Sequence, residues 1–157
     1  MYHMITQEEK KYNLMRIKKL NENAIVPTKG SEYAAGYDLY AVLEDEKITI
    51  WPHDTVMIDT GWAMKIPKGY FGAIFARSGL ASKQGLRPAN CVGVIDSDYR
   101  GPVKVALHND TNEHQIVRQG DRIAQLVIIP YNQIDFVEVD DLDETERGAG
   151  GFGSTGV

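Results

Sequence analysis

The sequence has little cysteine, no long apolar run and no excess of positive charge, and each shortage removes a class of protein. Cys91 is the single cysteine among 157 residues, so an intramolecular disulfide and a multi-cysteine zinc site are both excluded. The longest uninterrupted apolar run, from Leu126 to Ile129, ends at Pro130 and is far too short to cross a membrane as a helix. With 17 basic and 22 acidic residues the net charge is −5, which argues against a nucleic acid polymer as partner.

The beginning of the chain lacks the apolar core of a signal peptide. Charged residues are interleaved with apolar ones throughout the first twenty positions. Together with the single cysteine, this pattern predicts a protein of a reducing compartment, the cytoplasm, with no membrane partner. A small anionic ligand remains compatible with the negative net charge, because local donors or a bound cation outweigh the global sign.

Short apolar or alternating runs recur along the chain, and its fifteen glycines and six prolines fall mostly between them. This rhythm is typical of an all-β sandwich or jelly roll. A short helix is expected over Gly79–Gln84. Strands are expected at Leu14–Leu20, Tyr37–Leu43, Ile48–Trp51, Thr55–Thr60, Tyr70–Ala76, Val92–Ile95, Val103–Leu107, Arg122–Ile129 and Phe136–Val139.

The two ends of the chain differ in composition from its middle. A chain that is 43% hydrophobic over 157 residues can bury one core, and no composition shift argues for a second domain. The sequence predicts an N-terminal extension over residues 1–13, a β domain over 14–139 and a C-terminal arm over 140–157. The arm is acidic up to Glu146 and glycine-rich from Arg147 to Gly156, so we expect it to stay outside the core and to be mobile.

The glycine-rich arm has the composition of a phosphate-binding segment. Its glycines leave backbone N–H groups unshielded, Ser154 and Thr155 add hydroxyl donors, and Arg147 adds a guanidinium suited to phosphate oxygens. Phe152 stands alone among glycines, where its ring is suited to stacking on a nucleobase. The segment is not a P-loop, because Ser154 occupies the position of the required lysine. The alternative interpretation is a disordered chain end.

A second segment, Asn90–Gly101, consists of an apolar strand followed by a turn that contains carboxylates. Asp96 follows Val94 and Ile95 directly, so it is expected at a partly desolvated strand edge. A carboxylate in that position can act as a general base toward water. The alternative is a strand-end aspartate that caps its own turn.

A third segment, Ala76–Gly79, lies where a strand is expected to pass into the short helix. Exposed amides, the hydroxyl of Ser78 and the guanidinium of Arg77 can meet an anion there. The alternative is an ordinary helix start with Ser78 as its N-cap.

Two further polar residues lie within expected strands. Strict alternation over Gly120–Ile128 places Gln125 with Ile123 on one face and Arg122 with Ala124 on the other. Gln125 is then either a cross-strand hydrogen-bonding residue or a ligand contact. Asp38 is either a functional carboxylate or a strand-edge charge.

Several chemically active side chains are not assigned to a site. Cys91 is expected to be a small buried residue, because no histidine or aspartate is arranged around it as in a nucleophilic site. Trp51 and Trp62 are expected to pack in the fold. The histidines have no metal-binding spacing and are treated as surface or structural residues: His3, His53, His108 and His114.

Taken in order, five segments resemble the five motifs of the trimeric dUTPase family. The resemblance covers about residues 15–156, and five motifs in order are far more specific than any one of them. The matching segments are Ala34–Leu39, Ala76–Leu80, Gly93–Gly101, Gly120–Leu126 and Arg147–Gly156.

The resemblance implies a distorted, β-clip-like jelly roll that assembles as a homotrimer. Three active sites are implied at subunit boundaries, with the arm of one chain closing over a site of another. The implied activity is magnesium-dependent hydrolysis of dUTP to dUMP and pyrophosphate, which limits uracil incorporation into DNA and supplies dUMP for dTMP synthesis.

The resemblance also implies a role for each matching residue. Asp96 corresponds to the carboxylate that orients and deprotonates the attacking water, and Tyr99 to the ring that packs against the deoxyribose. Asp38 corresponds to the carboxylate that reaches Mg²⁺ through water. Uracil recognition is implied for Asn90, Gly93, Val94 and Ile95; phosphate contacts for Arg77, Ser78, Gly79 and Gln125; and γ-phosphate clamping and base covering for Arg147, Phe152, Gly153, Ser154 and Thr155.

Two other functions fit the same fold. A dCTP deaminase-like enzyme is disfavoured by the complete glycine-rich fifth motif and by the Gly93–Gly101 hairpin. A regulatory protein that binds dUTP without hydrolysing it is disfavoured by the intact set of candidate catalytic residues.

Overall fold

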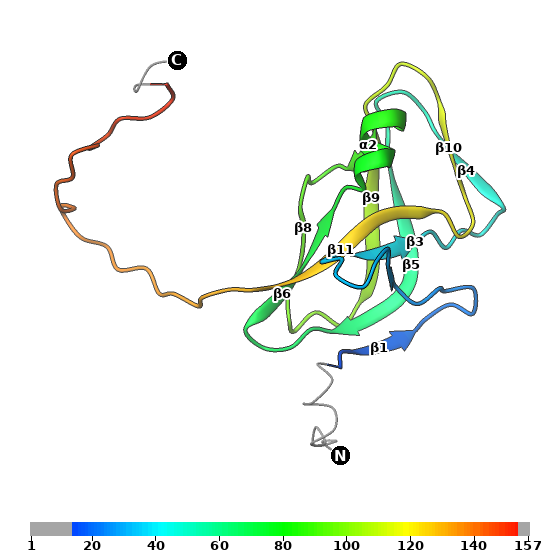
Figure 1. Cartoon of the computed structure of the whole chain (residues 1–157), viewed down its shortest axis with the longest axis horizontal. Helices are drawn as coiled ribbons and strands as arrows, with labels where there is room; N and C mark the ends of the chain where they lie inside the picture. Colours follow the sequence, from blue (N-terminus) through cyan, green and yellow to red (C-terminus); the bar gives the residue numbers. More distant parts are fainter. Residues whose placement is uncertain (1–13, 154–157) are drawn as a thin grey trace.

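The structure, a computed structural model, describes residues 14–153, and nearly all of its regular structure is β (Figure 1). The strands are β1 (Arg16–Lys19), β2 (Thr28–Lys29), β3 (Tyr37–Tyr40), β4 (Lys47–Ile50), β5 (Thr55–Lys65), β6 (Tyr70–Phe75), β7 (Leu86–Pro88), β8 (Gly93–Ile95), β9 (Pro102–Asn109), β10 (Gln115–Arg118) and β11 (Arg122–Pro130). The helix α2 (Ser78–Gln84) connects β6 to β7. The expected all-β fold and the expected short helix are confirmed.

The strands form two main sheets and one smaller ribbon. One sheet has the strand order β1-β5-β9-β7, the other has the order β2-β3-β11-β6-β8, and β4 pairs with β10. Neighbouring strands are antiparallel throughout these sheets, and several neighbours are distant in sequence, such as β3 and β11. This crossing-over of connections is the jelly-roll arrangement that closes two sheets around one core.

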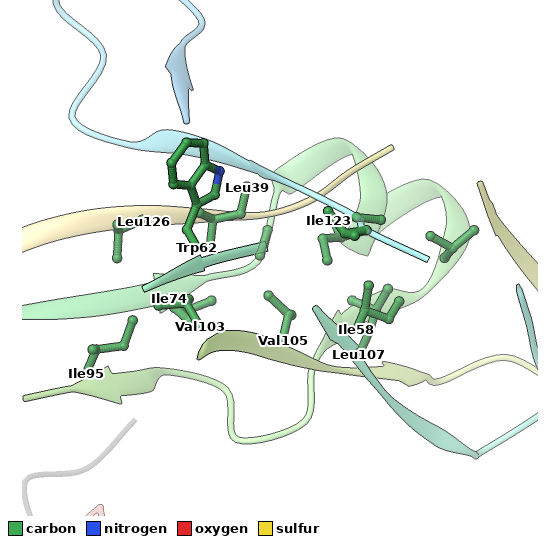
Figure 2. Packing of buried hydrophobic residues seen from close by; sticks show 14 of the residues in the cluster. Leu39, Ile58, Trp62, Ile74, Ile95, Val103, Val105, Leu107, Ile123 and Leu126 are labelled. Atoms are coloured by element: carbon green, nitrogen blue, oxygen red, sulfur yellow. The ribbon is translucent and has the colours of Figure 1, made fainter. Parts of the chain in front are cut away.

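The core lies between the two sheets, as Figure 2 shows. On β9 the side chains of Val103, Val105 and Leu107 are buried, while the residues between them face outward. This alternation has the period expected of a strand with one face on the core. From the other sheet, Leu39 and Leu126 pack into the same cluster.

The strand β5 is longer than the sequence indicates, because it continues through Gly61. The pairing register with β9 shifts between Asp59 and Ala63, and Gly61 has a φ of 76°. A Cβ atom at position 61 would lie 2.5 Å from the Cβ of Ala24. Glycine therefore permits a bulge where the sequence predicts a strand end.

Other differences have similar local causes. The short strands β2, β7 and β10 are absent from the sequence prediction, since two to four residues carry little periodicity. The expected strand at Phe136–Val139 is wrong for the single chain, where these residues are exposed and unpaired. Trp62 packs in the core as expected, but Trp51 is 60% exposed.

Between residues 14 and 153, no helix has the length and the apolar composition needed to cross a bilayer.

Asn109 is a fully buried amide whose hydrogen bonds are all satisfied. Its Nδ2 atom donates to the carbonyl oxygens of Ile50, at 3.0 Å, and Glu113, at 2.8 Å. Its Oδ1 atom accepts from the backbone N–H and from the hydroxyl of Thr111, at 2.9 and 2.7 Å. The side chain thus joins the end of β9 to β4 and to the following turn.

We expect Asn109→Leu to lower the free energy of unfolding by roughly 2–4 kcal/mol, because it leaves buried partners without hydrogen bonds. Urea unfolding followed by circular dichroism measures this loss. Asn112→Leu, in the same turn, is the control: its side chain makes an exposed hydrogen bond to His53 at 2.9 Å, and we expect a cost below about 1 kcal/mol. Equal costs for the two substitutions would contradict a special role for Asn109.

Candidate active site

A cleft lies at the edge of the five-stranded sheet, where β8 faces β9. The strand β8 is the last in its sheet and pairs with β6, with Gly72 opposite Ile95 and Ile74 opposite Gly93. This pairing is close, since a Cβ atom at position 72 would lie 2.8 Å from Ile66 Cδ1 and 3.3 Å from Ile95 Cβ. Glycine at position 72 therefore allows the hairpin around β8 to pack against the core.

The cleft has a volume of about 460 Å³ and brings together six residues predicted from the sequence. Its size lies in the range of small-molecule sites. Met57 on β5 and Lys104 on β9 also line it, and the sequence analysis missed both because their strands carry no motif. The predicted residues that line the cleft are Asn90, Gly93, Val94, Ile95, Asp96 and Tyr99.

Asp96 and Tyr99 enclose a turn at the mouth of this cleft. The N–H of Tyr99 donates to the carbonyl oxygen of Asp96 at 3.1 Å, and the Tyr99 hydroxyl donates to the carbonyl oxygen of Pro102, also at 3.1 Å. Asp96 is exposed, so the partial desolvation expected for it is absent in the single chain. The reason is that β8 is an edge strand, and the residues between 14 and 153 leave the carboxylate uncovered.

The expected burial of Cys91 is also wrong. The thiol is exposed, and the residue has a φ of 62° in the turn between β7 and β8. The apolar run that follows Cys91 in the sequence indicates burial, but the residue itself belongs to the turn rather than to the strand.

A second cluster forms where β3, β6 and β11 meet. The carboxylate of Asp38 is largely buried and accepts from Arg77 Nε at 2.8 Å and from Arg122 Nη1 at 3.4 Å. Two guanidinium groups on one carboxylate leave further N–H donors free to meet an anion. Asp38 is therefore an ion-paired group and more than a strand-edge charge.

The sequence does not indicate Arg122 as a site residue, because β11 contains a bulge. The pairing with β3 passes from Arg122 opposite Tyr40 to Ala124 opposite Leu39, so one residue of β11 is extra. Beyond the bulge the alternation is reversed, and Arg122 faces the same side as Gln125. The sequence expectation that these two residues lie on opposite faces is wrong for this reason.

Gln125 and Ser78 each have a defined local role. Gln125 Nε2 donates to the carbonyl oxygen of Ala76 at 2.8 Å, which is the cross-strand bond considered above. Ser78 is not the N-cap: that position is occupied by Arg77, without a side-chain capping bond. Ser78 and Gly79 form the start of α2 and directly follow Arg77 in the sequence. Both residues are exposed.

The described part of the arm leaves the β domain after β11 (Figure 1). Arg147 Nε donates to the carbonyl oxygen of Gly150 at 2.8 Å, so this stretch folds back only on itself. Phe152 is fully exposed and has a φ of 52°, next to Gly153 at 88°. Ser154 and Thr155, also predicted as site residues, lie outside the described residues.

The two clusters lie far apart within one chain. Ile95 pairs with Gly72, so Asp96 follows at the level of Phe71, whereas Arg77 lies beyond the opposite end of β6. Six residues of extended strand separate backbone positions by on the order of 20 Å. This separation greatly exceeds the distance between neighbouring phosphorus atoms of one nucleotide. Within one chain, Asp96 and Arg77 therefore lie at opposite ends of β6.

The surroundings of Asp38 suit metal binding through water rather than direct coordination. The part of the chain that the structure describes contains no group of three or more histidine, cysteine, aspartate or glutamate residues able to hold an ion. Asp38 has both oxygens engaged by arginines but retains lone pairs for water hydrogen atoms. Its setting fits a Mg²⁺ ion whose ligands are mainly phosphate and water oxygens.

Residues 22–156, nearly the whole chain, match the sequence model of one protein family, described as dUTPase. The chain belongs to the dUTPase family. Relatives named deoxyuridine 5'-triphosphate nucleotidohydrolase include that of Yarrowia lipolytica, 50% identical over 91% of this chain and 89% of the relative. Another, from Nautilia profundicola, is 48% identical over 90% of this chain and 98% of the relative.

Solved dUTPase structures have the same fold. A mutant dUTPase of Staphylococcus bacteriophage 80alpha with dUpNHpp superposes with a TM-score of 0.84 at 29% identity, covering 92% of this chain and 99% of that one. A mutant dUTPase from phage phi11 of S. aureus, described with a structural Mg(II) ion, gives 0.76 at 26% identity over 84% and 100%. These neighbours support the distorted jelly roll as the fold of this dUTPase.

The arginine cluster predicts an anion-binding surface on this dUTPase. Arg77→Gln removes a guanidinium, and we expect it to weaken binding of inorganic tripolyphosphate about ten-fold, since a charge-assisted hydrogen bond contributes roughly 1.5–3 kcal/mol. Isothermal titration calorimetry measures the change. Arg118→Gln, on β10 and outside both clusters, is the control, and equal affinities for the two variants would contradict the assignment.

Proposed function

We propose that this dUTPase hydrolyses dUTP to dUMP and pyrophosphate at sites that each combine residues of three chains. The observation that carries the proposal is the cleft that holds Asn90, Tyr99 and Asp96 together. It contains one amide for a base, one ring for a sugar and one carboxylate for a water.

Asp96 is the general base in this mechanism. Its carboxylate is at the mouth of the cleft and can accept a proton from a water directed at the α-phosphorus. The attack forms the bond from the water oxygen to phosphorus, and the bond to the bridging oxygen breaks, so that pyrophosphate leaves. Closure by neighbouring chains would supply the desolvation that the exposed carboxylate lacks.

The cleft selects the nucleoside by hydrogen bonding and by shape. Asn90 lies on the turn before β8, so its amide and the backbone of Gly93, Val94 and Ile95 can read the edge of a uracil base. The ring of Tyr99 is tethered to Pro102 and packs where a deoxyribose would lie, leaving no room for a ribose 2′-hydroxyl.

Phosphate binding is assigned to the arginine cluster. Arg77 with the exposed Ser78 and Gly79 at the start of α2, and Gln125 on β11, form the phosphate-facing group. Asp38 holds Arg77 in place and can accept hydrogen bonds from metal-bound water. A Mg²⁺ ion bound mainly by substrate phosphates and water would supply positive charge beside the leaving group, with Asp38 contacting its water.

A homotrimer accounts for the separation of the two clusters. In the proposed trimer, the cleft of one chain lies opposite the arginine cluster of a second chain. The two clusters of one site then belong to different chains, so the separation of on the order of 20 Å along β6 within each chain does not keep them apart. The unpaired segment after β11 supports assembly, because it exposes large apolar side chains that a partner would bury. The exposed fractions are 65% for Ile134, 93% for Phe136, 81% for Val137, 57% for Val139 and 84% for Leu142.

The arm of a third chain completes each site in this proposal. Phe152 has no partner ring within its own described chain and is suited to cover a base, with Gly153 allowing the turn beside it. Arg147, with Ser154 and Thr155, provides donors for the terminal phosphate. The arm, which begins at residue 140, then closes over the nucleotide. The cytoplasm, a reducing compartment, remains the proposed location and suits the exposed thiol of Cys91.

We expect Asp96→Asn to lower kcat for dUTP by at least about a thousand-fold while dUTP still binds, because the amide cannot accept the proton. A coupled assay of pyrophosphate release measures kcat, and equilibrium binding of a non-hydrolysable dUTP analogue measures affinity. Asp98→Asn removes a neighbouring carboxylate from the same turn and should stay within a few-fold of the parent protein. A kcat for Asp96→Asn close to that of Asp98→Asn would refute the base role.

A further inference from the structure

The turn that presents Asn90 is held in an unfavourable backbone conformation. The N–H of Cys91 donates to the carbonyl oxygen of Pro88 at 3.1 Å, and the N–H of Val92 donates to that of Asn90 at 2.6 Å. Cys91 has a φ of 62°, which non-glycine residues adopt rarely. A turn of this kind persists only where its surroundings favour it.

Arg87, on β7, makes four hydrogen bonds that link this turn to Asp110, which directly follows the neighbouring strand β9. Its Nε and Nη2 atoms donate to Asp110 Oδ2 and Oδ1 at 2.5 and 2.9 Å, as a two-pronged pair. Its Nη1 atom donates to the carbonyl oxygen of Pro88 at 3.3 Å and to Cys91 Sγ at 3.4 Å. One guanidinium therefore contacts a fixed carboxylate and the Pro88–Cys91 turn at the same time.

The carboxylate that holds Arg87 is itself well anchored. The N–H of Asp110 donates to the carbonyl oxygen of Gly85 at 2.9 Å, and Arg87 pairs with His108 in the β7–β9 ladder. The hydrogen bond from Arg87 holds the pKa of the Asp110 carboxyl below its ordinary value, against an opposing effect of desolvation, and the charge of Arg87 adds to the lowering. Asp110 and Arg87 thus form a two-pronged pair whose backbone positions are fixed by the pairing of β7 with β9 and by the Asp110–Gly85 hydrogen bond.

We propose that Arg87 is a positioning residue for nucleoside recognition: it holds the Pro88–Cys91 turn so that Asn90 faces the cleft. This inference rests on the proposed function, in which Asn90 reads the base. Arg87 does not line the cleft and acts only through the turn. An exposed ion pair contributes little to stability, so loss of Arg87 should affect substrate binding more than folding.

We expect Arg87→Gln to raise KM for dUTP by about five-fold or more, with kcat within two-fold of the parent and the melting temperature nearly unchanged. A misplaced Asn90 weakens binding of the base but leaves Asp96 and the phosphate contacts in place. Steady-state kinetics and thermal unfolding of the full chain measure these quantities. A parental KM would overturn the proposal.

Two further variants separate positioning from simple charge pairing. Arg87→Lys keeps a charge for Asp110 but cannot contact the carboxylate and the turn together. The exchange variant Arg87→Asp with Asp110→Arg keeps an ion pair across the same positions but removes the donors to the turn. We expect both to show the raised KM, and a parental KM in either would overturn the proposal. If Arg87→Gln fails to fold, Arg87→Lys provides the deciding measurement.

Asn90→Ala distinguishes failure of this inference from failure of the proposed function. If Asn90→Ala raises KM and Arg87→Gln does not, only the positioning role is wrong. If Asn90→Ala leaves KM unchanged, the base contact in the proposed function is wrong, and the route through Asn90 is wrong with it. The inference predicts that the double variant has nearly the KM of Asn90→Ala alone, whereas independent effects would multiply and contradict it.

Discussion

The antiparallel pairing of β6 with β8 is the constraint on which the functional account depends. Gly72 opposite Ile95 fixes where Asp96 leaves the sheet, and Arg77 follows the other end of the same strand. A side chain at position 72 would meet Ile66 and Ile95, so glycine at this position permits the pairing. The backbone hydrogen bonds that build the fold therefore hold apart Asp96 and Arg77, to which the proposed function assigns base catalysis and phosphate binding.

In the proposed trimer, a single chain presents parts of a site rather than a complete one. Asp96 lacks cover, Phe152 is fully exposed, and the apolar residues after β11 face solvent. Each of these exposed groups is unfavourable or has no function in an isolated chain, and in the proposed trimer each would contact a neighbouring chain. The arginines on Asp38 also explain how a protein with a net charge of −5 can bind an anion: the positive charge is local and already oriented.

The sequence predicts the periodic parts of this protein and misses those where the period breaks. The alternation on β9 and the short helix α2 are as expected, because local pattern and burial agree there. The sequence pattern places Arg122 on the wrong face of β11, because a single extra residue in this strand reverses the alternation of side chains. Met57 and Lys104 reach the cleft only because β5 and β9 pair beside it, and no local pattern encodes that proximity. The Phe136–Val139 segment has the composition of a strand but pairs with no strand among the described residues.

The central claim is that one site combines Asp96 of one chain with the arm of another, and mixing two inactive variants tests it most directly. Chains carrying Asp96→Asn and chains lacking residues 147–157 are unfolded together, refolded in equal amounts, and assayed for pyrophosphate release from dUTP. Random assembly of shared sites predicts that turnover returns in roughly a quarter of them, well above either variant alone. No recovery in trimers shown to contain both variants would contradict the account, as would full activity of the parent protein as a monomer.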